Sequence, residues 1–204
     1  DYTLYLCTDS GLMSCNTVEE SIERAIQGGV SVVQLREKEA SSRGLFELAK
    51  RVKRVTDKYD VPLIINDRLD ICLAVDAAGV HLGQTDLPCS EARRILGAEK
   101  IIGVSAATPE EAAKAQSDGA DYLGVGAVFA TSTKTNTRPV TAETIRAIRS
   151  AVDIPFVVIG GVNSENISGL YGMGINGAAV ISAIISQPDI TAAARKMRQA
   201  AERL

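Results

Sequence analysis

A short basic stretch carries the most chemically suggestive residues of the sequence. Gln34, Arg36 and Lys38 alternate with Leu35 and Glu37 at the end of an apolar run. Successive side chains of a strand point to opposite faces, so the amide and the two cations share one face, and Leu35 fits the other, toward a helix. This face suits an anionic ligand. The alternative, which the stretch alone does not exclude, is a solvent-exposed strand end.

Two carboxylates follow the next apolar runs. Asp67 comes directly after Asn66, and Asp86 closes the stretch 83–86. Mg²⁺ is commonly held by one or two carboxylates together with phosphate oxygens, so two acids near two cations predict a magnesium ion that bridges to a phosphorylated substrate. The alternative is that Asp67 and Asp86 cap the helices that follow them.

Hydroxyl groups and glycines follow the remaining apolar runs. They are Ser105, the run Thr131, Ser132, Thr133 and Lys134, the pair Gly160 and Gly161, and Ser182 directly after Ile181. Hydroxyls and a lysine can donate to phosphate oxygens, and glycines let backbone amides approach an anion, so we expect a second phosphate-bearing molecule here. A Gly-Gly pair is also common in tight turns, and the polar stretch 131–141 is also typical of a mobile surface loop.

All of these residues follow short apolar runs that recur along the whole chain. The runs are residues 4–7, 30–35, 62–65, 79–82, 101–104, 122–128, 155–159 and 178–181. Continuous apolar segments are typical of strands buried on both faces, and strands that alternate with helices predict a parallel sheet. Eight such units predict an α/β fold, a (β/α)8 TIM barrel, in which loops at the carboxyl ends of the strands form the active site.

Helical patterns fill the intervals between the runs. The first is expected to begin at Asn16 or Thr17, the second at Ser41 or Ser42, and the others span 69–77, 90–96, 109–118, 141–151, 164–173 and 190–204. Ser, Thr and Asn are favoured as amino-terminal caps, which supports the first two starts.

Composition excludes several classes of protein. The 204 residues carry a net charge of −3, which argues against a broad nucleic-acid-binding face, and no apolar run could span a membrane. One histidine, His81, rules out a site with several imidazoles, and we expect it to pack within its strand. We expect one domain over residues 1–204, idle cysteines, small-molecule partners and a cytoplasmic location. Because the chain begins at Asp1, we expect a short segment to precede it.

Six motifs, read in order, closely resemble the thiamin phosphate synthase family. They are residues 34–38, 66–67, 83–86, 103–105, 131–134 and 159–161. Each motif alone is unspecific, but the ordered set spans nearly the whole chain. The resemblance implies Mg²⁺-dependent coupling of hydroxymethylpyrimidine pyrophosphate to a thiazole phosphate or its carboxylated form, with release of pyrophosphate.

The resemblance also implies residue roles. Pyrimidine pyrophosphate contacts fall on Gln34, Arg36, Lys38, Asn66, Ser105 and Lys134, metal ligands on Asp67 and Asp86, and thiazole phosphate contacts on Thr131, Ser132, Thr133, Gly161, Ile181 and Ser182. Leu35, Glu37 and Gly160 complete the expected substrate contacts. The expected catalytic residues are Arg36, Lys38, Lys134 and Ser105.

The sequence departs from the family pattern at two positions. Ala107 stands where members often have histidine, which argues against the proton-transfer activity of a related thiazole tautomerase group, and Ala130 replaces a common proline. A non-catalytic paralogue that binds thiazole or thiamin phosphate is the main alternative, although the intact Lys38, Asp67, Asp86 and Lys134 speak against it. A sugar-phosphate isomerase fits poorly with the basic strand.

Overall fold

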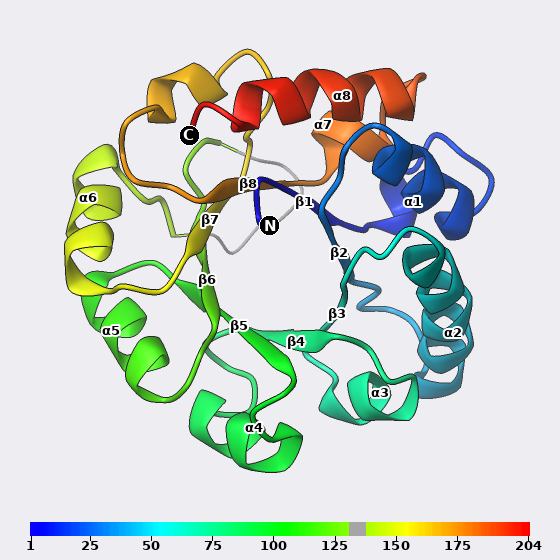
Figure 1. The fold of residues 1–204 in the computed structure, drawn as a ribbon, viewed down its shortest axis with the longest axis horizontal. Coiled ribbons are helices and arrows are strands. Elements are labelled where there is room, and N and C mark those ends of the chain that lie inside the picture. The colour runs from blue at the N-terminus through cyan, green and yellow to red at the C-terminus, as the bar shows by residue number, and fades with distance from the viewer. Residues whose placement is uncertain (131–137) are drawn as a thin grey trace.

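The chain folds into a closed barrel of eight parallel strands that lie side by side in chain order (Figure 1). The computed structural model describes residues 1–130 and 138–204, so the predicted contacts Thr131, Ser132, Thr133 and Lys134 lie outside the described residues. The strands are β1 (Leu4–Cys7), β2 (Val32–Leu35), β3 (Leu63–Asn66), β4 (Gly79–Leu82), β5 (Ile101–Ala106), β6 (Tyr122–Gly126), β7 (Phe156–Ile159) and β8 (Gly177–Val180). The predicted α/β class and (β/α)8 barrel are confirmed.

Helices surround the barrel, and local capping residues start several of them (Figure 1). They are α1 (Val18–Gln27), α2 (Ser42–Lys58), α3 (Leu69–Ala74), α4 (Cys89–Leu96), α5 (Pro109–Ser117), α6 (Ala142–Ala151), α7 (Ser182–Ile185) and α8 (Ile190–Ala201), with the short 3-10 helices η1 (Ser10–Leu12) and η2 (Ile167–Leu170). Thr17 and Ser41 cap α1 and α2 through their side-chain oxygens, as their sequence positions predict.

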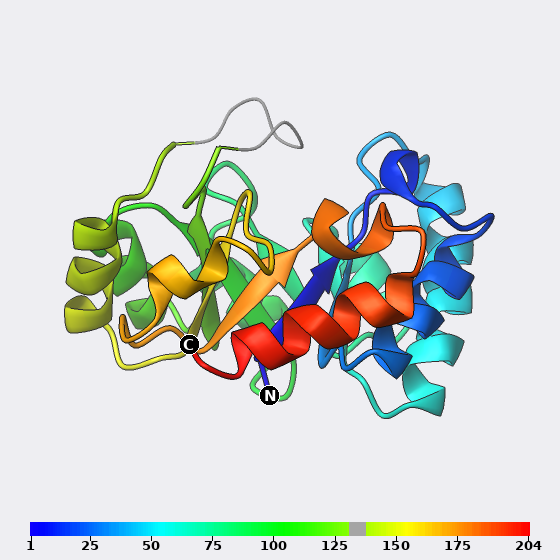
Figure 2. The same cartoon turned by 90° about the horizontal axis from the view of Figure 1, so that it is seen from above.

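The two ends of the barrel differ in what they carry. Figure 2 shows the amino terminus at one end and η1 and α7, which follow β1 and β8, at the other end. The parallel register brings the carboxyl ends of all strands to that second end, with β8 pairing back onto β1 through Leu6 and Val180. Residues that follow the strands are therefore gathered around a common mouth.

Strand side chains divide between two layers of core. The outer layer lies between the strands and the helices, and the inner layer fills the barrel with Tyr5, Cys7, Val32, Ile64, Tyr122, Val157 and Ala179. Barrel interiors are usually filled by branched aliphatic side chains, so two tyrosines here are a departure. Glycine makes room for one of them, because a Cβ at Gly103 would lie 2.1 Å from the Tyr122 ring.

The predicted helix 164–173 is wrong, because only the short η2 forms there. Asn163 Oδ1 accepts the backbone N–H groups of Glu165 at 2.9 Å and Asn166 at 3.2 Å. These side-chain bonds offer the backbone an alternative to the helix ladder. Gly172 then adopts a φ of 75°, which ends any right-handed helical path.

Several strand boundaries also differ from the predictions, by one or two residues. β2 begins at Val32 rather than residue 30, and β6 ends at Gly126 rather than residue 128. The latter ends early because Ala127 turns to pair with Arg138 and Val140, with N–H···O distances of 3.1 and 2.8 Å. The last strand lies one residue earlier than predicted, since Ile181 is the N-cap of α7, a helix that the sequence pattern did not predict.

Cys7, Cys15, Cys72 and Cys89, all within the described ranges, form no disulfide. Over residues 1–130 and 138–204, no helix has the length and apolar character needed to cross a membrane.

Candidate active site

A cavity of about 130 Å³ lies at the mouth of the barrel, and its charged lining residues follow β2, β3 and β4. The predicted residues that line it are Gln34, Arg36, Lys38, Asn66, Asp67, Asp86, Ser105 and Ile181. They come from strands and loops that are far apart in sequence, and the parallel barrel gathers them at one end. We call this the first cavity.

Asp67 and Asp86 form an acidic pair on one wall of the first cavity. The pKa of Asp67 is raised to about 6, first by burial of its carboxyl group and then by the neighbouring Asp86 carboxylate. The cations Lys38 and Arg36 lower that pKa only in part, and the Lys38 Nζ lies 3.9 Å from the Asp67 carboxylate. Two carboxylates held this close suit a divalent cation, whose charge would offset both.

Neither carboxylate caps the helix that follows it. The N-cap residues of α3 and α4 are Arg68 and Pro88, and neither makes a side-chain capping bond. Asp67 instead has a φ of 63°, and Asp86 Oδ2 accepts the backbone N–H of Gly83 at 2.6 Å. The helix-cap alternative is therefore wrong for both. Among the described residues no group of three or more His, Cys, Asp or Glu side chains could hold a metal, and the acidic pair is a group of two.

Arg36 presents an unpaired donor at the same place. Its Nε is buried and has no hydrogen-bond partner among the residues that the structure describes. A buried N–H without an acceptor costs free energy, so this atom favours an anionic ligand at the cavity wall. The backbone around Arg36 is held in place, because its N–H donates to Thr8 Oγ1 at 2.9 Å.

Leu35 and Glu37 point away from the first cavity, and neither side chain lines it. Leu35 is buried in the outer core, toward the helices, as strand alternation predicts. Glu37 accepts hydrogen bonds from Thr8 Oγ1 at 3.1 Å and Ser10 Oγ at 2.6 Å. These two side chains serve packing and the loop after β1, and substrate contact at the two positions stays a prediction.

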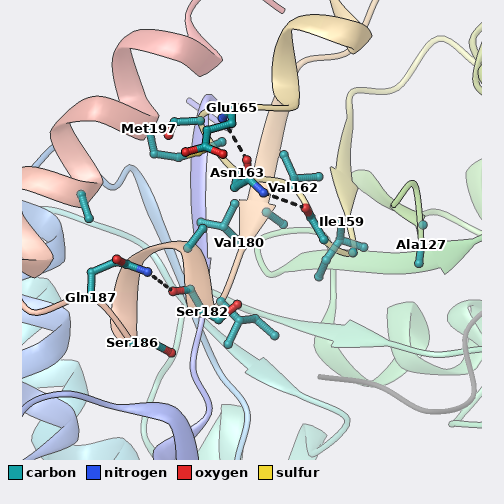
Figure 3. A pocket seen from close by; sticks show the side chains of 18 of the residues that line it. Ala127, Ile159, Val162, Asn163, Glu165, Val180, Ser182, Ser186, Gln187 and Met197 are labelled. Atoms are coloured by element: carbon teal, nitrogen blue, oxygen red, sulfur yellow. Dashed lines mark hydrogen bonds between the residues drawn. The ribbon is translucent and has the colours of Figure 1, made fainter. Parts of the chain in front are cut away.

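A second cavity of about 950 Å³ lies beside the first, between the loops after β6, β7 and β8 and the start of α8 (Figure 3). Gly160, Gly161 and Ser182 line it, and Ile181 lines both cavities. Further residues common to both are Ser105, Gly124, Ile159 and Ala179. The two cavities are thus open to the same mouth, and the structure brings the predicted anion-binding glycines next to the charged wall.

The glycine pair also fixes the loop that leads out of β6. Gly160 and Gly161 have φ values of 97° and 67°. A Cβ at Gly160 would lie 2.5 Å from Ala127 Cβ, and one at Gly161 would lie 2.5 Å from the carbonyl oxygen of Ala130. Only glycine permits this backbone shape and this close approach. The pair therefore holds residues 127–130, directly before the predicted hydroxyl-rich loop.

Ile181 and Ser182 belong to a helix start rather than to a strand end. Ser182 is the first residue of α7, and its carbonyl oxygen accepts the Gln187 Nε2 at 3.3 Å (Figure 3). The short helix forms one wall of the second cavity. The structure places both residues beside the glycines, as predicted, but at the start of a helix and not at the end of a strand.

Comparison with known proteins decides the family. Residues 4–184 match the family model described as thiamine monophosphate synthase. The chain belongs to this family. The thiamine-phosphate synthase of Ruminiclostridium cellulolyticum is 58% identical over 197 residues, covering 97% of this chain and 94% of the relative. That of Clostridium botulinum is 52% identical over 204 residues, covering 100% and 96%.

Solved structures agree with this family membership. The thiamine phosphate pyrophosphorylase from Pyrococcus furiosus superposes with a TM-score of 0.90 at 39% identity, covering 98% of this chain and 95% of the other. The (S)-3-O-geranylgeranylglyceryl phosphate synthase from Thermoplasma acidophilum shares only the fold, with a TM-score of 0.74 at 15% identity. The family that the sequence predicts is confirmed.

The site of this thiamine monophosphate synthase family member contains further polar residues that sequence reasoning missed. His81 does lie in β4, as predicted, but its ring lines the first cavity and its Nε2 lies 3.0 Å from Ser105 Oγ. Its Nδ1 lies 2.9 Å from the Tyr122 hydroxyl. The available signal was register, because Tyr5, His81 and Tyr122 fall at inward-facing positions of strands that are otherwise apolar.

Proposed function

We propose that this site couples hydroxymethylpyrimidine pyrophosphate to a thiazole phosphate or its carboxylated form, with Mg²⁺, and releases pyrophosphate. Membership of the family makes the chain a synthase of the transferase class, as the sequence predicts. The carbon–oxygen bond to pyrophosphate breaks and its electron pair leaves with the pyrophosphate. The thiazole nitrogen then forms the new carbon–nitrogen bond with its lone pair.

The observation that carries the proposal is the charge arrangement of the first cavity. Arg36 and Lys38 face Asp67 and Asp86 across a small space, and the Arg36 Nε has no partner within the described ranges. Fixed cations at a site of developing negative charge stabilise the transition state without reorganisation. We assign Arg36 and Lys38 to the departing pyrophosphate.

Asp67 and Asp86 are the residues that would hold the metal. Their oxygens suit Mg²⁺, and the pKa of Asp67 is raised first by burial of its carboxyl group and then by the neighbouring Asp86. Bound there, Mg²⁺ would neutralise charge on the pyrophosphate. The pair itself contributes a fixed anionic wall that selects a cation at this position.

Pyrimidine contacts are assigned to Gln34, Asn66 and Ser105, which line the first cavity between the cations and the barrel interior. Thiazole phosphate contacts are assigned to the second cavity. They comprise Gly160, Gly161, Ile181 and Ser182, with Thr131, Ser132 and Thr133 from outside the described residues. Lys134, which also lies outside the described residues, is assigned to the pyrophosphate. The proposed catalytic residues are Arg36, Lys38, Lys134 and Ser105. Because the cavities share one mouth, the two reactants can meet without leaving the protein.

Small molecules are the partners of this reaction. We propose that residues 1–204 act as one domain on these substrates in the cytoplasm, without nucleic acid or membrane as a partner. The net charge of −3 supports the absence of a nucleic-acid face.

The test is a pyrophosphate-release assay with each substrate alone and with both, with Mg²⁺ and with excess EDTA. We expect release only when both substrates and Mg²⁺ are present. Calorimetry on the same sample measures binding. Thiazole phosphate binding without any pyrophosphate release would overturn the proposal in favour of the non-catalytic paralogue.

A further inference from the structure

A continuous chain of hydrogen bonds crosses the barrel interior below the first cavity. Gln34 Nε2 donates to the Tyr5 hydroxyl at 2.8 Å, and the hydroxyls of Tyr5 and Tyr122 lie 2.7 Å apart. The chain continues from Tyr122 to His81 Nδ1 at 2.9 Å and from His81 Nε2 to Ser105 Oγ at 3.0 Å. It therefore links β2, β1, β6, β4 and β5. Its two ends, Gln34 and Ser105, both line the first cavity.

The middle of this chain is dry. Tyr5 and Tyr122 are 1% and 0% exposed. Burial raises the pKa of both tyrosines well above the usual range, so each keeps its single hydroxyl proton. A buried hydroxyl without an acceptor is costly, so each of these protons has to be donated to a neighbour.

Counting the protons gives the chain one direction. The amide nitrogen of Gln34 can only donate, so Tyr5 accepts from it and donates to Tyr122. Tyr122 in turn donates to His81 Nδ1, which requires an unprotonated Nδ1. The ring proton is then on Nε2, which donates to Ser105 Oγ. Ser105 is left with its own proton to give, and its Oγ makes no other hydrogen bond to a described residue.

We propose that Tyr5, Tyr122 and His81 are positioning residues, which fix Ser105 as a hydrogen-bond donor toward the bound pyrimidine pyrophosphate. With the reverse order, Ser105 would donate to His81 and offer a lone pair to the cavity instead. The chain thus sets which chemical group of the substrate Ser105 recognises, namely an acceptor atom. This inference rests on the proposed function for the identity of the substrate, but the proton order does not.

The first test reads the proton order directly and needs no substrate. The sequence contains one histidine, so ¹⁵N-labelled histidine in the chain without a histidine tag gives the ring signals of His81 alone. We expect the ¹⁵N–¹H spectrum to show a protonated Nε2 and an unprotonated Nδ1. A proton on Nδ1 would overturn the inference, whatever the assay shows.

A matched pair of tyrosine variants tests whether the Tyr122 hydroxyl determines which ring nitrogen of His81 carries the proton. Y122F removes the hydroxyl that donates to His81 Nδ1, and we expect the Nε2–H preference to weaken. Y171F removes a hydroxyl that donates to the Ala200 carbonyl at 3.1 Å elsewhere in the molecule, and we expect the His81 signals to stay the same. Equal spectra for Y122F and the unmodified protein would contradict the inference.

Two variants of His81 separate positioning from stability. In H81N the amide oxygen can accept from Tyr122, but the contact with Ser105 is lost. In H81Q the amide nitrogen can reach Ser105, but Tyr122 loses its acceptor. We expect H81N to lose roughly five- to tenfold in kcat/KM for the pyrimidine substrate, as the loss of one hydrogen bond implies, and H81Q to lose less. Thermal midpoints should fall in the opposite order, with H81Q the less stable.

The outcomes distinguish this inference from the proposed function. If the unmodified protein releases no pyrophosphate, the proposed function fails while the histidine spectrum still decides the proton order. If the unmodified protein is active and the activity of the two His81 variants simply follows their thermal midpoints, the residue is merely structural and the positioning role is wrong.

Discussion

The two halves of the barrel mouth are built on different principles. The half after β2 to β4 carries charged side chains around a cavity of about 130 Å³. The half after β6 to β8 surrounds about 950 Å³ mainly with glycines, small side chains and the short helix α7, and the charged residues Arg138, Glu165, Asp189 and Lys196 also line it. In the first half the side chains supply the charge, and in the second half the backbone shape supplies the space.

This difference matches two separate tasks. A departing pyrophosphate needs fixed positive charge close to where its own charge develops. An incoming nucleophile needs to be held in line, which depends on room and on backbone donors. Variants in the first half should therefore act mainly on turnover, and variants in the second half mainly on binding and stability.

The largest expected effect comes from removing one carboxylate from the charged half of the mouth. Asp67→Ala or Asp86→Ala removes one oxygen ligand, and we expect turnover at saturating substrate to fall by about 10²- to 10³-fold and most of the Mg²⁺ dependence to disappear. Pyrophosphate release across a Mg²⁺ titration measures both. Asp70→Ala is the matched control, because Asp70 is an exposed acid paired with Arg68 outside both cavities. Equal Mg²⁺ curves for all variants would contradict the assignment.

Lys134→Ala is expected to slow turnover by about 10²-fold while weakening thiazole phosphate binding much less. The expectation rests on the family resemblance, since Lys134 lies outside the described residues. Single-turnover rates and calorimetry with thiazole phosphate separate the two effects. Lys114→Ala removes an exposed lysine paired with Asp118 on α5 and serves as the control. A loss confined to thiazole binding would move Lys134 to the other half of the mouth.

Gly161→Ala tests the second half. The new Cβ would meet the Ala130 carbonyl oxygen at 2.5 Å at a φ of 67°, so we expect roughly 1–3 kcal/mol of lost stability and a higher KM for thiazole phosphate. Gly172→Ala has a similar φ of 75° with nothing within 4 Å, so it carries the backbone strain alone. Thermal unfolding and initial rates compare the two. An unchanged KM in Gly161→Ala would show that the glycine serves only the fold.

The smallest expected effect concerns the cost of the Asp67 charge to the stability of the fold. A carboxyl whose pKa is raised to about 6 in the folded chain, from an unfolded value near 3.8, destabilises the fold once it ionises. We expect Asp67→Asn to stabilise the Mg²⁺-free protein by on the order of 1 kcal/mol at pH 8, after allowance for partial exposure. Asparagine also tolerates the left-handed φ at this position.

The pH dependence of that gain provides its own control. The cost of the Asp67 charge is complete above pH 6 and fades as pH falls from 6 toward 3.8, so the gain should be smaller at pH 5 than at pH 8. Denaturant unfolding at the two pH values measures it. A gain of the same size at both values would exclude the charge of Asp67 as its source.

The sequence was sufficient for much of the charged half of the mouth. Strand alternation placed Gln34, Arg36 and Lys38 on the inner face and Leu35 outside, and the rule that parallel strands end together brought Asp67 and Asp86 near them. These predictions depend only on local periodicity and on the closed barrel.

The second half and the interior needed the structure. The predicted helix 164–173 does not form, because side-chain hydrogen bonds of Asn163 compete with the helical backbone bonds. The spacing of apolar residues carries no information about such side-chain bonds. The Tyr5–Tyr122 contact joins residues 117 positions apart and depends on the register of two strands that are not neighbours. The spacing of residues along the sequence does not predict that these two hydroxyls meet.

Pairing between β1 and β8 has a consequence for how the protein is made. The first strand can satisfy one edge as soon as β2 emerges from the ribosome, but its other edge has no partner until residues 177–180 have been synthesised. Open strand edges are templates for association with other chains, and long-range parallel pairing is slow. Until residues 177–180 have been synthesised, one edge of β1 therefore stays open to association with other chains.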